Sequence, residues 1–359
     1  MKMLKPVVRH RGSVIIIVLW TSVLLTILVT TMASKVRLQA RTAFHNQVAA
    51  NDWAAVQAAV NLAEAELMME RMPRPVGEQM EITDDGELRT PAYRFNGQPL
   101  SLNYPSREDM QVRIYDHSGK ISLHRISRRN MQALIEHRLG ENPDPNEVQR
   151  LLSAWTDWTD LNDLQGLDGA ESQYYQSLDP GYSPRNNLEL DSVDEILHIR
   201  GFAELFEGVN LDAAFTVYGS QASVNLNLAT REAMQLLPGL NDELIETLIA
   251  FRETEDIDNR FEVGLVIPTE NLVELSRWIG NNTSNVYSIF VYPEITAQSD
   301  DEPADEGEPR TDPVTQAYMK IVEVRNINQL PRVLQVNPYG QLPDTAPARV
   351  DEYNIVLPN

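Results

Sequence analysis

Apolar residues form an unbroken run near the start of the chain. Residues 13–34 (SVIIIVLWTSVLLTILVTTMAS) contain no charged side chain. At 1.5 Å per residue, this run gives about 33 Å of helix, which is enough to cross the core of a bilayer. The preceding residues include Lys2, Lys5, Arg9 and Arg11, and basic residues beside a span stay in the cytoplasm. We therefore expect a single-pass anchor with a cytoplasmic N-terminus and most of the chain exported.

The helical pattern continues beyond the apolar run. Residues 35–72 contain no proline or glycine and are rich in helix-forming Ala, Gln, Glu and Leu. Val56, Val60, Ala63 and Leu67 recur at spacings of four, three and four, which places them on one face. Two prolines follow directly and end the helix. The second half of this helix thus offers an apolar stripe to a globular domain.

The remainder of the chain mixes strand and helix patterns. Alternating residues predict strands at 111–116 and 120–124, joined as a hairpin, and further strands after residue 285. Helix patterns dominate between them. A long helix packed on an antiparallel sheet defines an α+β class, so we interpret the helical segment as a large inserted domain. Residues 299–312 hold seven acidic residues and two prolines and are expected to form a mobile loop.

An internal repeat lies within this region. Six residues recur at a constant offset of 103, with Ser127 and Thr230 at equivalent helix starts. The pairs are Tyr115 and Tyr218, Leu123 and Leu226, Arg128 and Arg231, Met131 and Met234, Gln132 and Gln235, and Leu134 and Leu237. A unit of strand, N-cap and helix is therefore predicted to occur twice.

Composition excludes several classes of function. The formal charge of −22 repels nucleic acid and anionic lipid headgroups. The chain has no cysteine, which removes disulfides, thiolate metal sites and cysteine nucleophiles. None of the common hydrolase, metalloprotease or nucleotide-binding motifs occurs. We expect no enzymatic activity and no organic cofactor.

Acidic residues crowd into one short segment. Six residues with oxygen ligands lie within 15 positions, namely Asp157, Asp160, Asn162, Asp163, Asp168 and Glu171. The spacing from Asp160 imitates a calcium loop, but Leu164 and Gln165 occupy positions that need a ligand and a glycine, so this is no EF-hand. A looser calcium site and a solvated acidic loop both remain open, because clustered carboxylates repel one another unless neutralised.

A helix-hairpin-helix pattern covers residues 224–253. Such modules often bind DNA by gripping a phosphate at a helix N-terminus. Here Asp242 and Glu243 occupy the first turn of the second helix, where they suit the helix dipole but repel an anion. We expect a packing module rather than a DNA-binding one.

The junction Arg11-Gly12-Ser13 distinguishes this anchor from an ordinary signal peptide. A basic residue and a glycine directly abut the apolar helix, which resembles the class III leader of type IV pilins and pseudopilins. That resemblance implies cleavage between Gly12 and Ser13 by a prepilin peptidase, with the helix retained and its new N-terminus methylated. The alternatives are conventional cleavage near Ala33 and an uncleaved signal anchor.

The chain as a whole resembles the minor pseudopilin K family of type II secretion systems. The resemblance is carried by the leader, the apolar helix, the acidic segment 157–175, residues 192–201 and residues 224–227. Most pilins have glutamate at the fifth mature position, whereas this chain has Ile17. A lone carboxylate in a bilayer is costly, so its absence suggests a subunit that needs no such partner.

The resemblance implies a place and a set of partners. It implies a subunit in the bacterial inner membrane, with most of the chain periplasmic, that caps the pseudopilus tip and primes fibre assembly for export of folded proteins. Minor pseudopilins of the I and J types, the major pseudopilin, the prepilin peptidase and the inner-membrane assembly platform would be its partners. It also implies calcium in the inserted domain, with Asp157, Asp160, Asp163 and Glu171 as candidate ligands.

Two other functions stay open from the sequence. One is a minor pilin of a type IV pilus, and the other is a membrane-tethered periplasmic DNA-binding protein. The expected divisions are a cleaved leader (1–12), a transmembrane half-helix (13–34), a periplasmic half-helix (35–72), a first pilin part (73–124), an inserted α-helical domain (125–285) and a second pilin part (286–359).

Overall fold

The structure is a computed structural model that describes residues 13–70, 95–100, 110–184, 188–254, 256–257, 259–293, 316–326 and 328–343. The chain divides into two compact units, residues 1–55 and residues 56–359. The expected leader (residues 1–12) and acidic loop (residues 299–312) lie outside the described residues.

The first unit contains most of helix α1 (Ser13–Glu70). α1 is long and apolar enough to cross a membrane. Its hydroxyl side chains donate hydrogen bonds to backbone carbonyls three or four residues earlier, as Thr21 does to Val18 and Thr26 does to Ser22. These bonds satisfy the polar groups within the helix itself, which a lipid environment requires. The predicted helix is confirmed over Ser13–Glu70, and the last two residues of the expected helix, 71 and 72, lie outside the described residues.

The second unit is built on a five-stranded antiparallel sheet in the order β1-β2-β5-β6-β7. The strands are β1 (Asn96–Pro99), β2 (Met110–Asp116), β5 (Val286–Pro293), β6 (Gln316–Glu323) and β7 (Arg332–Gln341). β2 and β5 are neighbours in register Ile114↔Ile289, although residues 117–285 separate them along the chain. The helical segment is therefore inserted between two paired strands, and the expected α+β fold is confirmed.

The last turns of α1 belong to this second unit and pack there. Ala59, Val60, Ala63 and Leu67 are all buried, so the predicted apolar stripe meets a core. Glu64, on the same part of α1, forms a 2.5 Å ion pair with Lys320 of β6. Lys320 is directly opposite Ile289 in the sheet, so this end of α1 lies against the sheet face that carries both residues.

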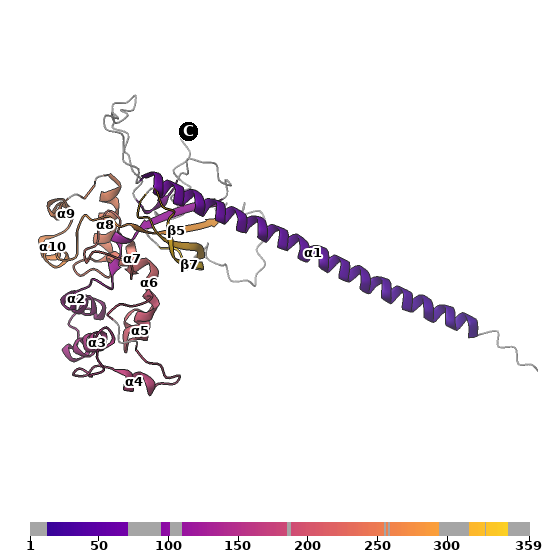
Figure 1. Ribbon diagram of the computed structural model, residues 1–359, viewed down its shortest axis with the longest axis horizontal. Helices are drawn as coiled ribbons and strands as arrows, with labels where there is room; N and C mark the ends of the chain where they lie inside the picture. Colours follow the sequence, from indigo (N-terminus) through magenta and orange to yellow (C-terminus); the bar gives the residue numbers. More distant parts are fainter. Residues whose placement is uncertain are drawn as a thin grey trace, which may run out of the picture. The chain divides into compact units, whose positions relative to one another are not determined.

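The segment between β2 and β5 is mainly helical and has its own large core (Figure 1). Its helices are α2 (Arg128–Leu139), α3 (Pro145–Trp158), α4 (Ser172–Gln176), η2 (Val193–His198), α5 (Phe202–Leu205), α6 (Leu211–Ala214), α7 (Arg231–Gln235), α8 (Asp242–Thr254), α9 (Arg260–Val266) and α10 (Thr269–Leu275). Figure 1 shows α2, α3, α4 and α5 gathered in one part of this block and α8, α9 and α10 in another.

The predicted hairpin of residues 111–124 is wrong. Strand β3 (Ile121–Ser122) does not pair with β2 but runs parallel to β4 (Phe215–Thr216) in a separate two-stranded sheet. The 3₁₀ turn η1 (His117–Gly119) redirects the chain, because the Asp116 carboxylate accepts a hydrogen bond from the Ser118 amide. Gly119 then passes so close to the backbone of Leu228 that a Cβ would lie 2.0 Å from its carbonyl oxygen.

The two copies of the repeat share local features. Ser127 caps α2 and Thr230 caps α7, and each side chain accepts a hydrogen bond from the amide three residues later. Met131 and Met234 are both completely buried in the helical core. Ile121 pairs in parallel with Phe215 in the first copy, and Val224 pairs in parallel with Ile279 in the second.

A buried polar network lies where the helical block meets the sheet. Lys120 donates hydrogen bonds to the Asp212 carbonyl at 2.7 Å and to the Ser288 hydroxyl at 3.1 Å. His117 bridges Thr216 and Ser288 at 2.7 and 2.8 Å. Burial, together with the nearby charge of Lys120, holds the pKa of His117 well below its usual value, so its imidazole is neutral.

Candidate functional site

The structure describes only one of the two residues at the expected N-terminal cleavage site. Gly12 lies outside the described residues, and Ser13 is the first residue of α1. Ile17, at the fifth expected mature position, is 60% exposed on the helix surface. An apolar side chain there can contact lipid without the cost that a carboxylate would carry. Cleavage at Gly12 itself stays a prediction.

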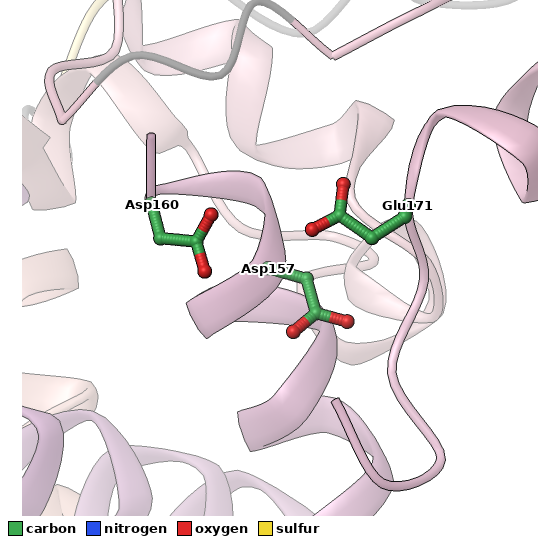
Figure 2. A group of neighbouring side chains, drawn as sticks. All are labelled: Asp157, Asp160 and Glu171. Atoms are coloured by element: carbon green, nitrogen blue, oxygen red, sulfur yellow. The ribbon is translucent and has the colours of Figure 1, made fainter. Parts of the chain in front are cut away.

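The acidic segment forms a compact cluster at the C-terminal end of α3. Asp157, Asp160 and Glu171 each place a carboxylate oxygen within 4.8 Å of the others (Figure 2). Asp157 lies in the last turn of α3, which ends at Trp158, and Asp160 follows directly after the C-cap residue Thr159. Glu171 comes from the segment that returns toward α4, and its carboxylate points toward the aspartates in Figure 2.

The fourth predicted ligand stands beside this cluster. Asp163 is not one of the three converging carboxylates, and its Oδ1 accepts a hydrogen bond from the Ser172 amide at 3.3 Å. A hydrogen bond from the Ser172 side chain, and to a smaller extent this amide bond, holds the pKa of Asp163 below its usual value. Asp163 therefore adds negative charge near Glu171, whose pKa it helps to raise.

Glu171 is the unusual member of the cluster. The residue is only 3% exposed, and among the described residues no N–H or hydroxyl group donates a hydrogen bond to either carboxylate oxygen, while the Asp163 carboxylate lies close enough to share a proton with it. Burial raises the pKa of Glu171 to about 7, and the charges of Asp157, Asp160 and Asp163 add to this effect. Burial likewise raises the pKa of Asp157. An unpartnered buried carboxylate beside others is unfavourable unless a proton or a cation neutralises it.

A loop closes over the cluster and fits it closely. The Gly166 amide donates to both carboxylate oxygens of Asp157, at 3.2 and 3.1 Å. A Cβ on Gly169 would lie 1.9 Å from Asp157 Oδ2, and one on Gly166 would lie 2.8 Å from Oδ1. Only glycine lets the backbone approach this closely. Gly169 belongs to the acidic segment that carries the family resemblance, but nothing in the sequence marks either glycine as packed against Asp157, since glycines are ordinary in loops.

The helix-hairpin-helix is occupied by contacts within the protein. Its hairpin joins α7 to α8, and the Asn241 side chain caps α8 by accepting from the Leu244 amide at 2.9 Å. Gly239 has a positive φ of 92°, and its carbonyl accepts a hydrogen bond from the Asn271 side chain of α10. Asp242 and Glu243 are exposed in the first turn of α8. This geometry favours packing and disfavours a phosphate.

The fold and this site define an α+β protein with a long apolar N-terminal helix and a helical insertion. Within it, residues 118–206 match the family described as "Type II secretion system (T2SS), protein K". The match covers about a quarter of the chain, from η1 through α5, and includes the acidic cluster. This match confirms, over residues 118–206, the resemblance to the protein K family of type II secretion systems that was predicted from the sequence.

The other comparisons are more distant. A search of curated proteins found no match. Among solved structures, the chain is similar to one in the crystal structure of the GspK–GspI–GspJ complex from the type 2 secretion system of enterotoxigenic Escherichia coli. The two share 12% sequence identity with a TM-score of 0.48, over 83% of this chain and 99% of that one.

Proposed function

We propose that this protein is a minor pseudopilin that caps the tip of a type II secretion pseudopilus and primes fibre assembly. The observation that carries the proposal is the protein K segment at residues 118–206, in a chain that begins with a membrane-length apolar helix. α1 would anchor the subunit in the inner membrane and pack with neighbouring pseudopilin helices. The helical insertion adds bulk that would obstruct a further subunit stacked above it.

The missing glutamate supports a terminal position. In a pilin fibre, a glutamate at the fifth mature position pairs with the N-terminal amine of a neighbour. Ile17 cannot form that pair, so this subunit does not need a neighbour on that side. Prepilin peptidase would free the amine by cutting after Gly12, and minor pseudopilins of the I and J types would join the subunit in the tip complex.

Processing and partnership can be tested together in membrane-extracted full-length protein. The N-terminus and intact mass are measured from cells with and without the prepilin peptidase, and co-purifying subunits are identified. A new N-terminus at Ser13 only with the peptidase, together with I- and J-type pseudopilins, is the expected result. Co-purification with pilus subunits would instead favour a type IV pilus. An unprocessed chain, or cleavage near Ala33, would remove the fibre proposal.

We also propose that the acidic cluster binds calcium. The residues fit a hard cation, because carboxylate oxygens are its preferred ligands and Glu171 has two buried oxygens that accept no hydrogen bond within the part of the chain that the structure describes. Asp157, Asp160 and Glu171 would hold the ion, with Asp163 adding charge nearby. When bound, calcium would supply the neutralising charge that lets these carboxylates lie together without a proton.

Thermal unfolding with and without calcium tests the site. Binding at 100 times Kd stabilises a protein by about 2.7 kcal/mol, so millimolar calcium is expected to raise the Tm of the wild type. Glu171→Gln should abolish the increase, while the exposed Glu189→Gln should keep it. An equal calcium response in Glu171→Gln and the wild type would exclude the cluster as the site.

A further inference from the structure

The loop over the acidic cluster carries an unusual apolar surface. Leu161, Leu164 and Leu167 recur every three residues and are 67%, 79% and 79% exposed. The loop's polar side chains are instead used internally. The Asp160 carboxylate accepts from the Asn162 amide at 3.0 Å, and the Asn162 side chain accepts from the Leu164 amide at 2.8 Å. This arrangement turns leucines toward solvent and polar groups toward the loop, the reverse of the usual pattern.

Contacts between this loop and the acidic cluster hold the three leucines in their exposed positions. The backbone at Gly166 and Gly169 is pressed against the Asp157 carboxylate, and these glycines flank Leu167. Gln165, beside Leu164, donates to the Gly169 carbonyl at 2.8 Å and closes the same turn. The leucines therefore cannot fold inward without breaking the contacts that cover Asp157. Any change in the charge of the cluster acts directly on the segment that displays them.

The charges around the leucines select the kind of surface that can cover them. No lysine or arginine occurs between residues 151 and 184, and Asp160, Asp163 and Asp168 lie among the leucines. Arg200 reaches the base of this loop from outside, where its guanidinium donates to the Gly169 carbonyl at 3.4 Å. Segments that insert into membranes usually pair apolar residues with lysine and arginine, and this loop would be repelled by anionic headgroups. A second copy of this chain would bring the same three aspartates and be repelled as well. A basic protein surface has the complementary charge.

We propose that residues 160–168 form a docking tip whose three leucines enter an apolar depression, flanked by lysine or arginine, on a partner protein. The acidic cluster holds the tip in shape, and in this respect the inference rests on the proposed calcium site. Occupation of the cluster by a cation relieves the repulsion beneath the loop, so docking is strongest with the cation bound. The leucines supply the apolar contact, and the exposed Asp163 and Asp168, which are not among the three converging carboxylates, select the partner by charge.

Photo-cross-linking in the bacterium that makes the protein tests the tip. The full-length chain carries p-benzoylphenylalanine in place of Leu164, or in place of Leu265 on α9 as a control of similar exposure. We expect a cross-link to a partner protein from position 164 and not from position 265. The cross-linked site on the partner should be apolar, with at least two lysines or arginines nearby. The yield of this cross-link should fall several-fold when calcium is chelated. The proposal would be overturned by a cross-link to phospholipid, to a second copy of this chain, or to an acidic or uncharged site on a protein, and equally by the absence of any cross-link. An unchanged yield after chelation would overturn the calcium dependence of docking.

Affinity for the identified partner gives an independent measurement. With the full chain in nanodiscs, the Leu161→Ser, Leu164→Ser, Leu167→Ser triple variant should bind at least tenfold more weakly, and raised salt should weaken the wild type. A Phe261→Ser, Leu265→Ser variant is the matched control and should bind normally. Equal binding by the triple variant would overturn the docking tip. Cleavage after Gly12 and co-purification of I- and J-type subunits are measured in the same cells. Failure of the proposed pseudopilin function can therefore be distinguished from failure of the docking tip.

Discussion

Lys120 allows the energetics of the junction between sheet and helical block to be tested by pH. The side chain is 2% exposed, and burial lowers the pKa of Lys120 from 10.5 to about 8. Asp212, Glu232 and Asp116 oppose this shift, while the neighbouring His117 is neutral. Ionised Lys120 is thus less favourable in the folded protein than in the unfolded chain. The substitution Lys120→Met removes this titration.

The sign and magnitude follow from the two pKa values. Below pH 8 both states hold the proton, and the full cost of the buried charge is present. Between pH 8 and 10.5 only the unfolded chain holds it, so raising the pH favours the folded state. One pKa unit corresponds to 1.36 kcal/mol, which gives a gain of about 2 kcal/mol between pH 7 and 9.5. The partly buried Tyr218, whose pKa is raised by burial, opposes this trend nearer pH 10.

Denaturant unfolding of the full chain in detergent, followed by tryptophan fluorescence, measures this gain. Trp155, Trp158 and Trp278 are buried in the helical core and report on its unfolding. The free energy of unfolding of the wild type should rise by about 2 kcal/mol relative to Lys120→Met between pH 7 and 9.5. Taking the difference between the two proteins cancels the titration of the tyrosines. Parallel pH profiles would refute the assignment of Lys120 as a buried, ionised group.

Two further substitutions test local packing. Gly169→Ala places a Cβ 1.9 Å from the Asp157 carboxylate, so we expect a loss of about 1–3 kcal/mol in unfolding free energy and of the calcium-induced rise in Tm. Gly264→Ala, whose Cβ meets only the end of Leu272 at 3.3 Å, is its control, and equal behaviour of the two would contradict the steric argument. Thr230→Ala removes a buried N-cap that also donates to the Ala213 carbonyl, and should cost about 1–2 kcal/mol in urea unfolding, more than the exposed cap variant Ser127→Ala. A larger loss for Ser127→Ala would show that burial of the cap does not set its contribution.

Periodicity predicted the long elements because it reports which residues need burial. The stripe at Val60, Ala63 and Leu67 was read directly from the sequence and is buried in the second unit. Short elements were read less well. Residues 120–124 were expected to form a strand paired with 111–116, but the strand there is β3 (Ile121–Ser122), which pairs with β4. Few residues carry the pattern in such segments, so contacts with distant parts of the chain decide their conformation.

The sequence by itself determined the apolar anchor, the basic leader, the acidic character and the set of carboxylates around Asp157, because each depends on residue type and local spacing. It could not determine which strands pair. β2 meets β5 rather than β3, since the turn at Asp116 and the close approach of Gly119 to Leu228 send the chain away from the sheet. Likewise, only the tertiary structure decided that Glu171, rather than Asp163, joins Asp157 and Asp160. The convergence of side chains depends on the path of the backbone between them, and here two glycines pressed against a carboxylate set that path.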